Sequence, residues 1–194
     1  MVKLNAKSNT QIKDVSFMRN LKVLDASCGC GIGHDGIVGL DLVELNMSRN
    51  TYITKISFMP SLKILHLEYS NLRQNEIDKL DLIMLNANGY SNDIANVSHM
   101  RNLKILSICG RCSRIDQTGI NGLDLIELNA ADNKKIKNVS FMRNLKILDA
   151  SGKCGITEIG IKGLVLEELL SHSNPNITTQ SFSNLRKMYI ELPF

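Results

Sequence analysis

The chain has 194 residues, of which 43% are hydrophobic and 22% are charged, and this composition excludes a disordered tail. The net charge of +4 is mild and no basic run exceeds the pair Lys134-Lys135, so a nucleic-acid partner is not expected. No segment has the pattern of a signal peptide or the length of a membrane span. We therefore expect one folded domain over residues 1–194, located in the cytoplasm, possessing no membrane contact.

A leucine motif recurs along the chain and sets its organisation. The steps between copies run from 19 residues (Leu166 to Leu185) to 22 residues (Leu103 to Leu125). A degenerate first copy contains Leu4 and Ala6. The pattern L-x-x-L-x-[LAIM] begins at Leu21, Leu42, Leu62, Leu82, Leu103, Leu125, Leu145, Leu166 and Leu185. A fixed period of this length predicts a repeat solenoid.

A longer period lies on top of the first, because two kinds of half-repeat alternate. One kind reads IKDVSFMRNLKVLDAS at 12–27 and returns at 53–68, 94–109 and 136–151. The other reads GIVGLDLVELNMSRN at 36–50 and returns at 76–90, 119–133 and 160–174. The true unit is therefore a pair of coils about 41 residues long.

Each copy of the motif, taken in chain order, predicts a strand of three to five residues whose alternate side chains point inward. Successive strands pair in parallel about 4.8 Å apart, so about ten coils form a rod of roughly 45–50 Å. Right-handed winding follows from the handedness of parallel crossovers. We expect a curved stack that has the sheet on its concave face and mostly extended or 3-10 segments on its convex side.

These motifs resemble the leucine-rich-repeat family over essentially the whole chain, and the resemblance implies an α/β solenoid that binds other proteins. The V-S-F-M halves are similar to the short repeats of phosphatase regulators and bacterial internalins, whose convex side is extended or 3-10-helical. The other halves, including 154–164, resemble the cysteine-containing repeats of ubiquitin-ligase substrate receptors. The paired texture also resembles repeat proteins encoded by large DNA viruses of amoebae.

The turn after each strand requires an inward side chain that satisfies backbone groups. Asparagine occupies this place in one kind of coil, and cysteine or asparagine in the other, where the family allows the exchange. The predicted residues are Asn9, Asn50, Asn133, Asn174, Cys30, Asn71, Cys112 and Cys154. Tyr90 stands where asparagine is expected, so we predict a local bulge at 88–93.

The sequence predicts no catalytic, cofactor or metal site. The five cysteines fall on three coils that are not adjacent, which favours buried reduced thiols; the alternative is a redox or partial metal site at Cys109 and Cys112. Ser151, His172 and Glu191 share one outward position, and the alternative to a polar surface row is a catalytic triad. An open sheet has neither a pocket nor an oxyanion hole, so we expect no enzyme.

The outward strand positions are the expected contact surface. Ile64, Met84 and Ile105 are predicted to form an apolar strip, whose polar rim has the character of a protein interface. The predicted rim is His66, Glu68, Asn86 and Ser107. The alternative is that these branched residues reflect only strand propensity inherited by repetition.

Two further surface features are predicted. Leu170 and Tyr189 should form an apolar patch at the last coils. The sequence shows no capping segment, so we expect a second copy to cover a terminal coil.

A row of basic side chains is also predicted along one margin of the sheet. Its members are Lys22, Lys63, Lys104, Lys146 and Arg186. A solvated rim is favoured for this row, and a nucleic-acid track is the alternative.

The sequence therefore predicts a non-enzymatic protein-interaction module or scaffold that uses the concave sheet. One alternative is the substrate-recognition subunit of a ubiquitin ligase. The other is a structural, virion-associated assembly protein.

Overall fold

The computed structural model describes residues 1–89 and 93–178, together with the backbone of 187–189. The chain divides into two compact units, Met1–Ile94 and Ala95–Phe194, and each is described by itself. The predicted bulge at Tyr90 lies outside the described residues, as do Arg186 and Glu191.

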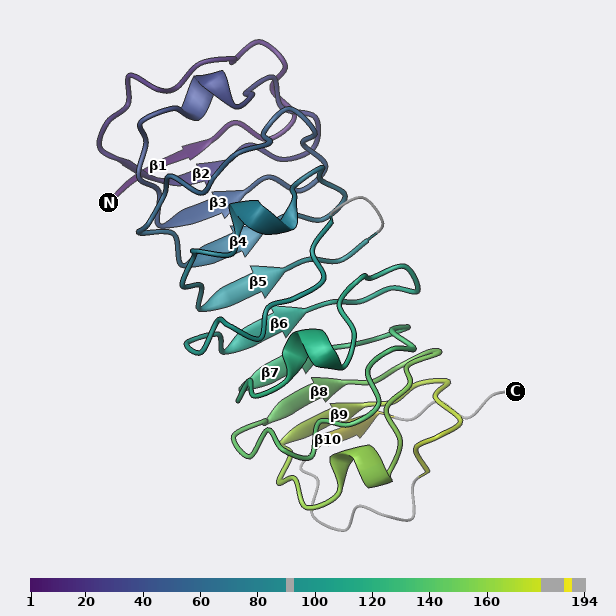
Figure 1. The fold of residues 1–194 in the computed structure, drawn as a ribbon. Helices are drawn as coiled ribbons and strands as arrows, with labels where there is room; N and C mark the ends of the chain where they lie inside the picture. Colours follow the sequence, from purple (N-terminus) through teal and green to yellow (C-terminus); the bar gives the residue numbers. More distant parts are fainter. Residues whose placement is uncertain (90–92, 179–186, 190–194) are drawn as a thin grey trace. The chain divides into compact units, whose positions relative to one another are not determined.

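The first unit is a solenoid built on a parallel sheet. Its strands pair in chain order, each with the next (Figure 1). They are β1 (Val2–Asn5), β2 (Leu21–Asp25), β3 (Glu44–Asn46), β4 (Ile64–His66) and β5 (Met84–Asn86). Two short 3-10 turns, η1 (Asp35–Ile37) and η2 (Gln74–Glu76), lie in the segments that connect strands.

The second unit repeats this plan. Its strands are β6 (Ile105–Ser107), β7 (Glu127–Asn129), β8 (Ile147–Asp149), β9 (Glu168–Leu170) and β10 (Lys187–Tyr189), all parallel and paired in order. The 3-10 turns are η3 (Thr118–Ile120) and η4 (Ile159–Ile161). The predicted parallel-sheet solenoid is confirmed, and it contains little helix. No helix in the described part of the chain is long and apolar enough to cross a membrane.

The 3-10 turns all occur in one kind of half-repeat. They fall in the halves that begin at 36, 76, 119 and 160, whereas the V-S-F-M halves contain hydrogen-bonded turns. In η1, the Gly36 carbonyl accepts the Val15 amide at 2.9 Å, and a Cβ on Gly36 would overlap the Lys13 carbonyl oxygen. Gly119 and Gly160 make the same contacts in the second unit. The glycine thus lets two successive coils approach closely.

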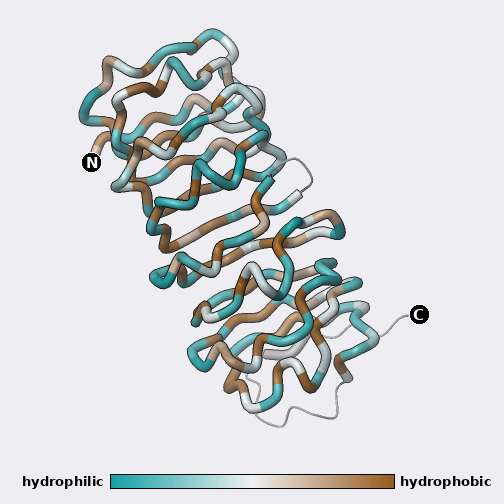
Figure 2. Tube along the Cα trace, viewed as in Figure 1, coloured by the Kyte–Doolittle hydropathy of each residue, from teal (hydrophilic) through white to brown (hydrophobic). Residues whose placement is uncertain are grey.

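The motif leucines fill the core of both units, as predicted. In the first unit, the central strand residues Leu24, Leu45, Leu65 and Leu85 are at most 1% exposed. Leu106, Leu128, Leu148 and Leu169 form the same ladder in the second. Burying each leucine contributes roughly 1.5–3 kcal/mol. The apolar residues recur at regular intervals along the trace of each unit (Figure 2).

The inward asparagines form a second ladder. The Asn50 side chain is fully buried, and its Nδ2 donates to the carbonyls of Ala26 (2.8 Å) and Ile32 (3.0 Å). Its Oδ1 accepts the amides of Tyr52 and Ile53. One side chain therefore joins two coils and satisfies four backbone groups.

The same arrangement recurs only in part along the predicted ladder. In the second unit, Asn133 and Asn174 each donate to two carbonyls of the preceding coil and accept one amide. Asn9, in contrast, is exposed, and its Oδ1 accepts the nearby amides of Gln11 and Ile12.

The corresponding prediction for the other coils is half right. Cys30 and Cys154 are buried at the predicted place. Asn71 and Cys112 are exposed, which contradicts the prediction, and Ser70 and Ser113 are buried beside them. The turn after β4 reaches the core one residue earlier and the turn after β6 one residue later, so a fixed spacing from the strand misplaces the inward residue.

Candidate functional site

The outward rows of the sheet have the predicted register. Ile64 is paired with Met84, and His66 with Asn86, on the adjacent strands β4 and β5. All four residues are half-buried. Two members of the predicted apolar strip therefore lie side by side in the first unit. Its third member, Ile105, belongs to the second unit, where its neighbour in the row is Glu127.

The polar column beside this row has a structural role that the sequence did not reveal. The last residue of most strands is Asn or Asp, and its side-chain oxygen accepts the backbone amide two residues later. In β2, for example, Asp25 Oδ1 accepts the Ser27 amide at 3.0 Å. Equivalent bonds involve Asn5, Asn46, Asn86, Asn129 and Asp149. Each is an Asx turn at the strand end.

The turn continues with a residue in the left-handed region, three places after the strand. Most of these residues are not glycine, among them Cys28 (φ 57°) and Tyr69 (φ 51°). A left-handed turn at each strand end accounts for the Asn and Asp column without any ligand. Four candidates at strand ends, His66, Ser107, Leu170 and Tyr189, are not Asx residues, so an Asx turn does not explain their presence.

Glu68 and Asn86, two residues of the predicted rim, are engaged within the unit. A Glu68 carboxylate oxygen accepts from the Asn88 side chain at 3.0 Å and from Asn86 at 3.5 Å. These contacts join the coils of β4 and β5 beside Ile64 and Met84. The polar side of the strip is thereby held in place.

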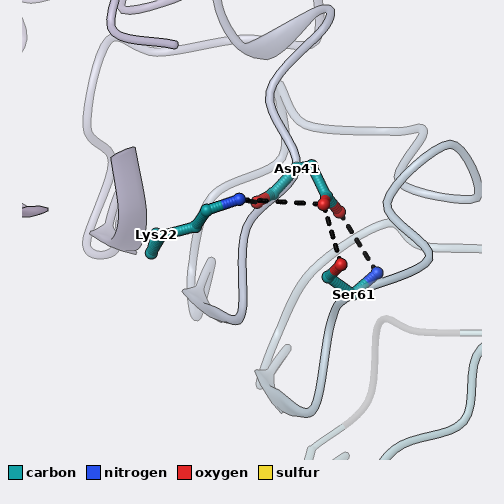
Figure 3. Close-up of polar contacts among 3 residues, drawn as sticks. All are labelled: Lys22, Asp41 and Ser61. Atoms are coloured by element: carbon teal, nitrogen blue, oxygen red, sulfur yellow. Dashed lines mark hydrogen bonds and ion pairs between the residues drawn. The ribbon is translucent and has the colours of Figure 1, made fainter. Parts of the chain in front are cut away.

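The lysine row is paired with acidic residues of the next coil. Lys22 Nζ donates to the Asp41 carbonyl at 2.8 Å and lies 3.7 Å from the Asp41 carboxylate, which also accepts from the Ser61 hydroxyl (Figure 3). The Ser61 hydroxyl, and to a smaller extent the Lys22 ammonium, lowers the pKa of Asp41 despite the opposing effect of burial.

The other described lysines of the row repeat this geometry. Lys63 contacts Asp81, Lys104 contacts the Asp124 carbonyl and Lys146 contacts Glu167. These pairs link successive coils at the margin of the sheet. Exposed pairs of this kind each contribute about 0–1 kcal/mol.

No disulfide joins the five cysteines, all of which lie in the described part of the chain. Their predicted burial is wrong for Cys28 and Cys112, which are exposed, while Cys109 is intermediate. In the described residues, no group of three or more His, Cys, Asp or Glu side chains could hold a metal ion. Of the predicted polar row, Ser151 and His172 are half-buried, and Glu191 lies outside the described residues.

The Leu170 patch is placed only in part. Leu170 is half-buried and its backbone pairs with Tyr189 on β10, in the predicted register. The Tyr189 side chain is outside the described part of the structure.

Two surface features were missed from the sequence. In the first unit, Phe17 (73% exposed) and Tyr52 (62% exposed) lie on the connecting segments, where the His34 ring also packs edge-on against Phe58. The recurrent Phe of the V-S-F-M halves could have indicated the exposed aromatic residue Phe17. In the second unit, a hollow of about 510 Å³ has Lys134 and Lys153 in its lining, and no sequence pattern indicated it.

No protein-family model matches the chain, and no curated protein sequence is significantly similar to it. The function is therefore inferred from the geometry of the sheet.

Proposed function

We propose that the chain is a leucine-rich-repeat solenoid of about ten coils that binds another protein through the outward face of its sheet, without catalysis. In the first unit, the contact surface centres on Ile64 and Met84. His66 and Glu68 form its polar rim.

The side-by-side placement of Ile64 and Met84 carries this proposal. Side chains alternate between the two faces of a strand, and the middle residues of β4 and β5, Leu65 and Leu85, are buried in the core. Ile64 and Met84 therefore point away from the core. Adjacent apolar side chains on an open sheet lose unfavourable contact with water when a partner covers them. His66, which does not form the Asx turn of its column, lies next to them.

The geometry that repeats from coil to coil supports the proposed leucine-rich-repeat assignment. The inward leucines and the asparagines Asn50, Asn133 and Asn174 perform the two tasks that a leucine-rich coil requires, which are filling the core and satisfying the turn. The lysine pairing favours a protein over a nucleic acid, because Lys22, Lys63 and Lys146 already contact carboxylates of their own chain.

The proposal is tested by comparing the proteins that the wild type and two variants capture from a native lysate. Met84→Arg places a charge in the centre of the surface, whereas Val38→Arg places it on a connecting segment, where Val38 is already 47% exposed. We expect Met84→Arg to reduce capture of a specific partner at least tenfold and Val38→Arg to leave it unchanged. Retention by Met84→Arg, or equal loss in both variants, would overturn the proposal.

A further inference from the structure

The sheet of the second unit has an outward row in which aliphatic and acidic residues alternate. The row contains Ile105, Glu127, Ile147 and Glu168 on the consecutive strands β6 to β9, and their backbones are in direct register. All four residues are half-buried. Ile147 thus lies between two carboxylates on one open face.

Neither of these two carboxylates is engaged by the rest of the described chain. Within residues 1–89 and 93–178, the side chains of Glu127 and Glu168 have no hydrogen bond and no ion pair. Asp149, in the adjacent row, adds a third negative charge, and one of its oxygens accepts the Ser151 amide. Lys187 on β10 follows Glu168 in the row, because their backbones are paired.

The lysines at the margin of this sheet are engaged elsewhere. Lys104 Nζ donates to the Asp124 carbonyl at 3.4 Å, and Lys146 Nζ lies 3.8 Å from Glu167. The carboxylates of the row are therefore left for an external cation, although the chain as a whole has a net charge of +4. Half-burial beside isoleucine weakens their hydration, which increases the gain from pairing with such a cation.

The first unit differs at the same positions. Its row contains Lys3, Val23, Glu44, Ile64 and Met84, so it has one carboxylate, whereas the row of the second unit, which continues to Lys187, has two. The acidic and aliphatic alternation is a property of the second unit.

We propose that the sheet face of the second unit binds an extended, basic segment of a protein partner. Arginine or lysine side chains of the segment pair with Glu127 and Glu168, and an apolar side chain covers Ile147. This inference rests on the proposed function, since it assigns the chemistry of the partner that the sheet binds.

The spacing of the row fits such a segment. Strands two apart in a sheet are about 9.6 Å apart, which is the expected backbone separation of Glu127 and Glu168. A polyproline II chain rises about 3.1 Å per residue and places every third side chain on one face, about 9.3 Å apart. A segment that crosses the strands with a cation at every third residue therefore matches the row.

The probe for this inference is a fluorescent peptide of three Arg-Leu-Pro repeats, and its matched control has Glu-Leu-Pro repeats. Anisotropy titration with the full chain measures the affinity of each. We expect only the basic peptide to bind, and its affinity to fall as salt is raised. Binding of both peptides, or of neither, would overturn the inference.

Three variants locate the peptide. The double variant Glu127→Gln, Glu168→Gln removes the charges at nearly constant size, and we expect it to weaken binding at least tenfold. Glu44→Gln makes the same change at the equivalent row position of the first unit and should alter binding less than twofold. Equal effects would show attraction to overall charge and overturn the inference. Ile147→Ser should weaken binding at least threefold, and no change would contradict the apolar contact.

The two proposals fail in distinguishable ways. If Met84→Arg abolishes capture of a protein partner while the Arg-Leu-Pro peptide does not bind, the basic specificity fails and the sheet remains the binding face. If the peptide binds as expected and Met84→Arg has no effect on capture, the first-unit surface fails and the acidic row stands.

Discussion

A carboxylate oxygen of Glu76 accepts the backbone amide of Ile56 at 3.0 Å, at the position where the other coil pairs use a glycine carbonyl. The same oxygen accepts the Ser57 amide at 3.2 Å, and Glu76 is only 8% exposed. In the equivalent pair, Val15 donates to the Gly36 carbonyl. A side chain therefore replaces a backbone acceptor, and the hydrogen bond between coils is kept.

Glu76→Ala is expected to destabilise the protein by about 1–3 kcal/mol, because it leaves the buried Ile56 amide and the neighbouring Ser57 amide without their acceptor. Glu76→Gln retains one acceptor oxygen and should cost less. Urea unfolding at pH 7 measures both free energies. If the Ala variant is as stable as the wild type, the amides have another acceptor.

The contribution of Glu76 should also depend on pH. Burial tends to raise the pKa of Glu76, but the amide hydrogen bonds of Ile56 and Ser57 outweigh it, and the folded pKa is below the ordinary glutamate pKa of 4.5. A lowered folded pKa means that the stabilisation is present above the unfolded pKa and is lost as pH falls through the folded pKa. The stability difference between wild type and Glu76→Ala should therefore shrink below about pH 4.5. A difference that stays constant down to pH 3 would contradict this.

Leu128→Ala is expected to cost about 2–5 kcal/mol in the free energy of unfolding, because Leu128 is fully buried on β7 between Leu106 and Leu148 of the neighbouring strands. Asn129→Ala, one residue further, removes the acceptor of the Ala131 amide (3.0 Å) and should cost about 1 kcal/mol. Urea melts of both variants give the comparison. Equal costs would contradict the inward and outward assignment.

The register of the sheet could be predicted because the motif fixes it twice. Leucines at the first and fourth positions must both be buried, and a slip of one residue would turn Leu24 outward and Val23 or Asp25 inward. Apart from a register shift between Val2 and Lys3 on β1, every described pairing therefore matches the spacing of the leucines. Hydrophobic burial is the strongest signal that a single sequence contains, and here it repeats in every coil.

The turns could not be predicted in the same way, because their geometry depends on hydrogen bonds rather than on period. Asn86 was predicted to belong to the polar rim of an interface, whereas its side chain forms an Asx turn with the Asn88 amide. Cys112 was placed inside by a fixed count from its strand and is exposed, since that turn differs in length. The ion pair of Lys22 with Asp41 joins residues 19 positions apart, which only the coil geometry brings together.

The five cysteines should differ widely in reactivity. Cys28 and Cys112 are exposed and should react with a thiol reagent within the fast phase, whereas buried Cys30 and Cys154 should react only on unfolding. Burial raises the pKa of Cys154 to about 11, which further suppresses its thiolate. Titration in denaturant without reductant should count five thiols. Cys28→Ser should remove one fast equivalent, and a fast phase without Cys28 or Cys112 would contradict the turn geometry.

Gly36→Ala tests the close approach of coils that the glycines permit. The added Cβ would overlap the Lys13 carbonyl oxygen and displace the carbonyl that accepts the Val15 amide. Overpacking of this kind costs about 1–3 kcal/mol, and we expect a loss in that range in urea unfolding. Gly33→Ala is the control, because the nearest atom to its Cβ is Tyr52 Cβ at 3.4 Å and Gly33 does not have a positive φ. There the alanine restricts the unfolded chain and should change stability by less than about 1 kcal/mol, towards higher stability. If Gly36→Ala behaves like Gly33→Ala, the coils can separate at no cost, and the glycine would not be needed for their contact.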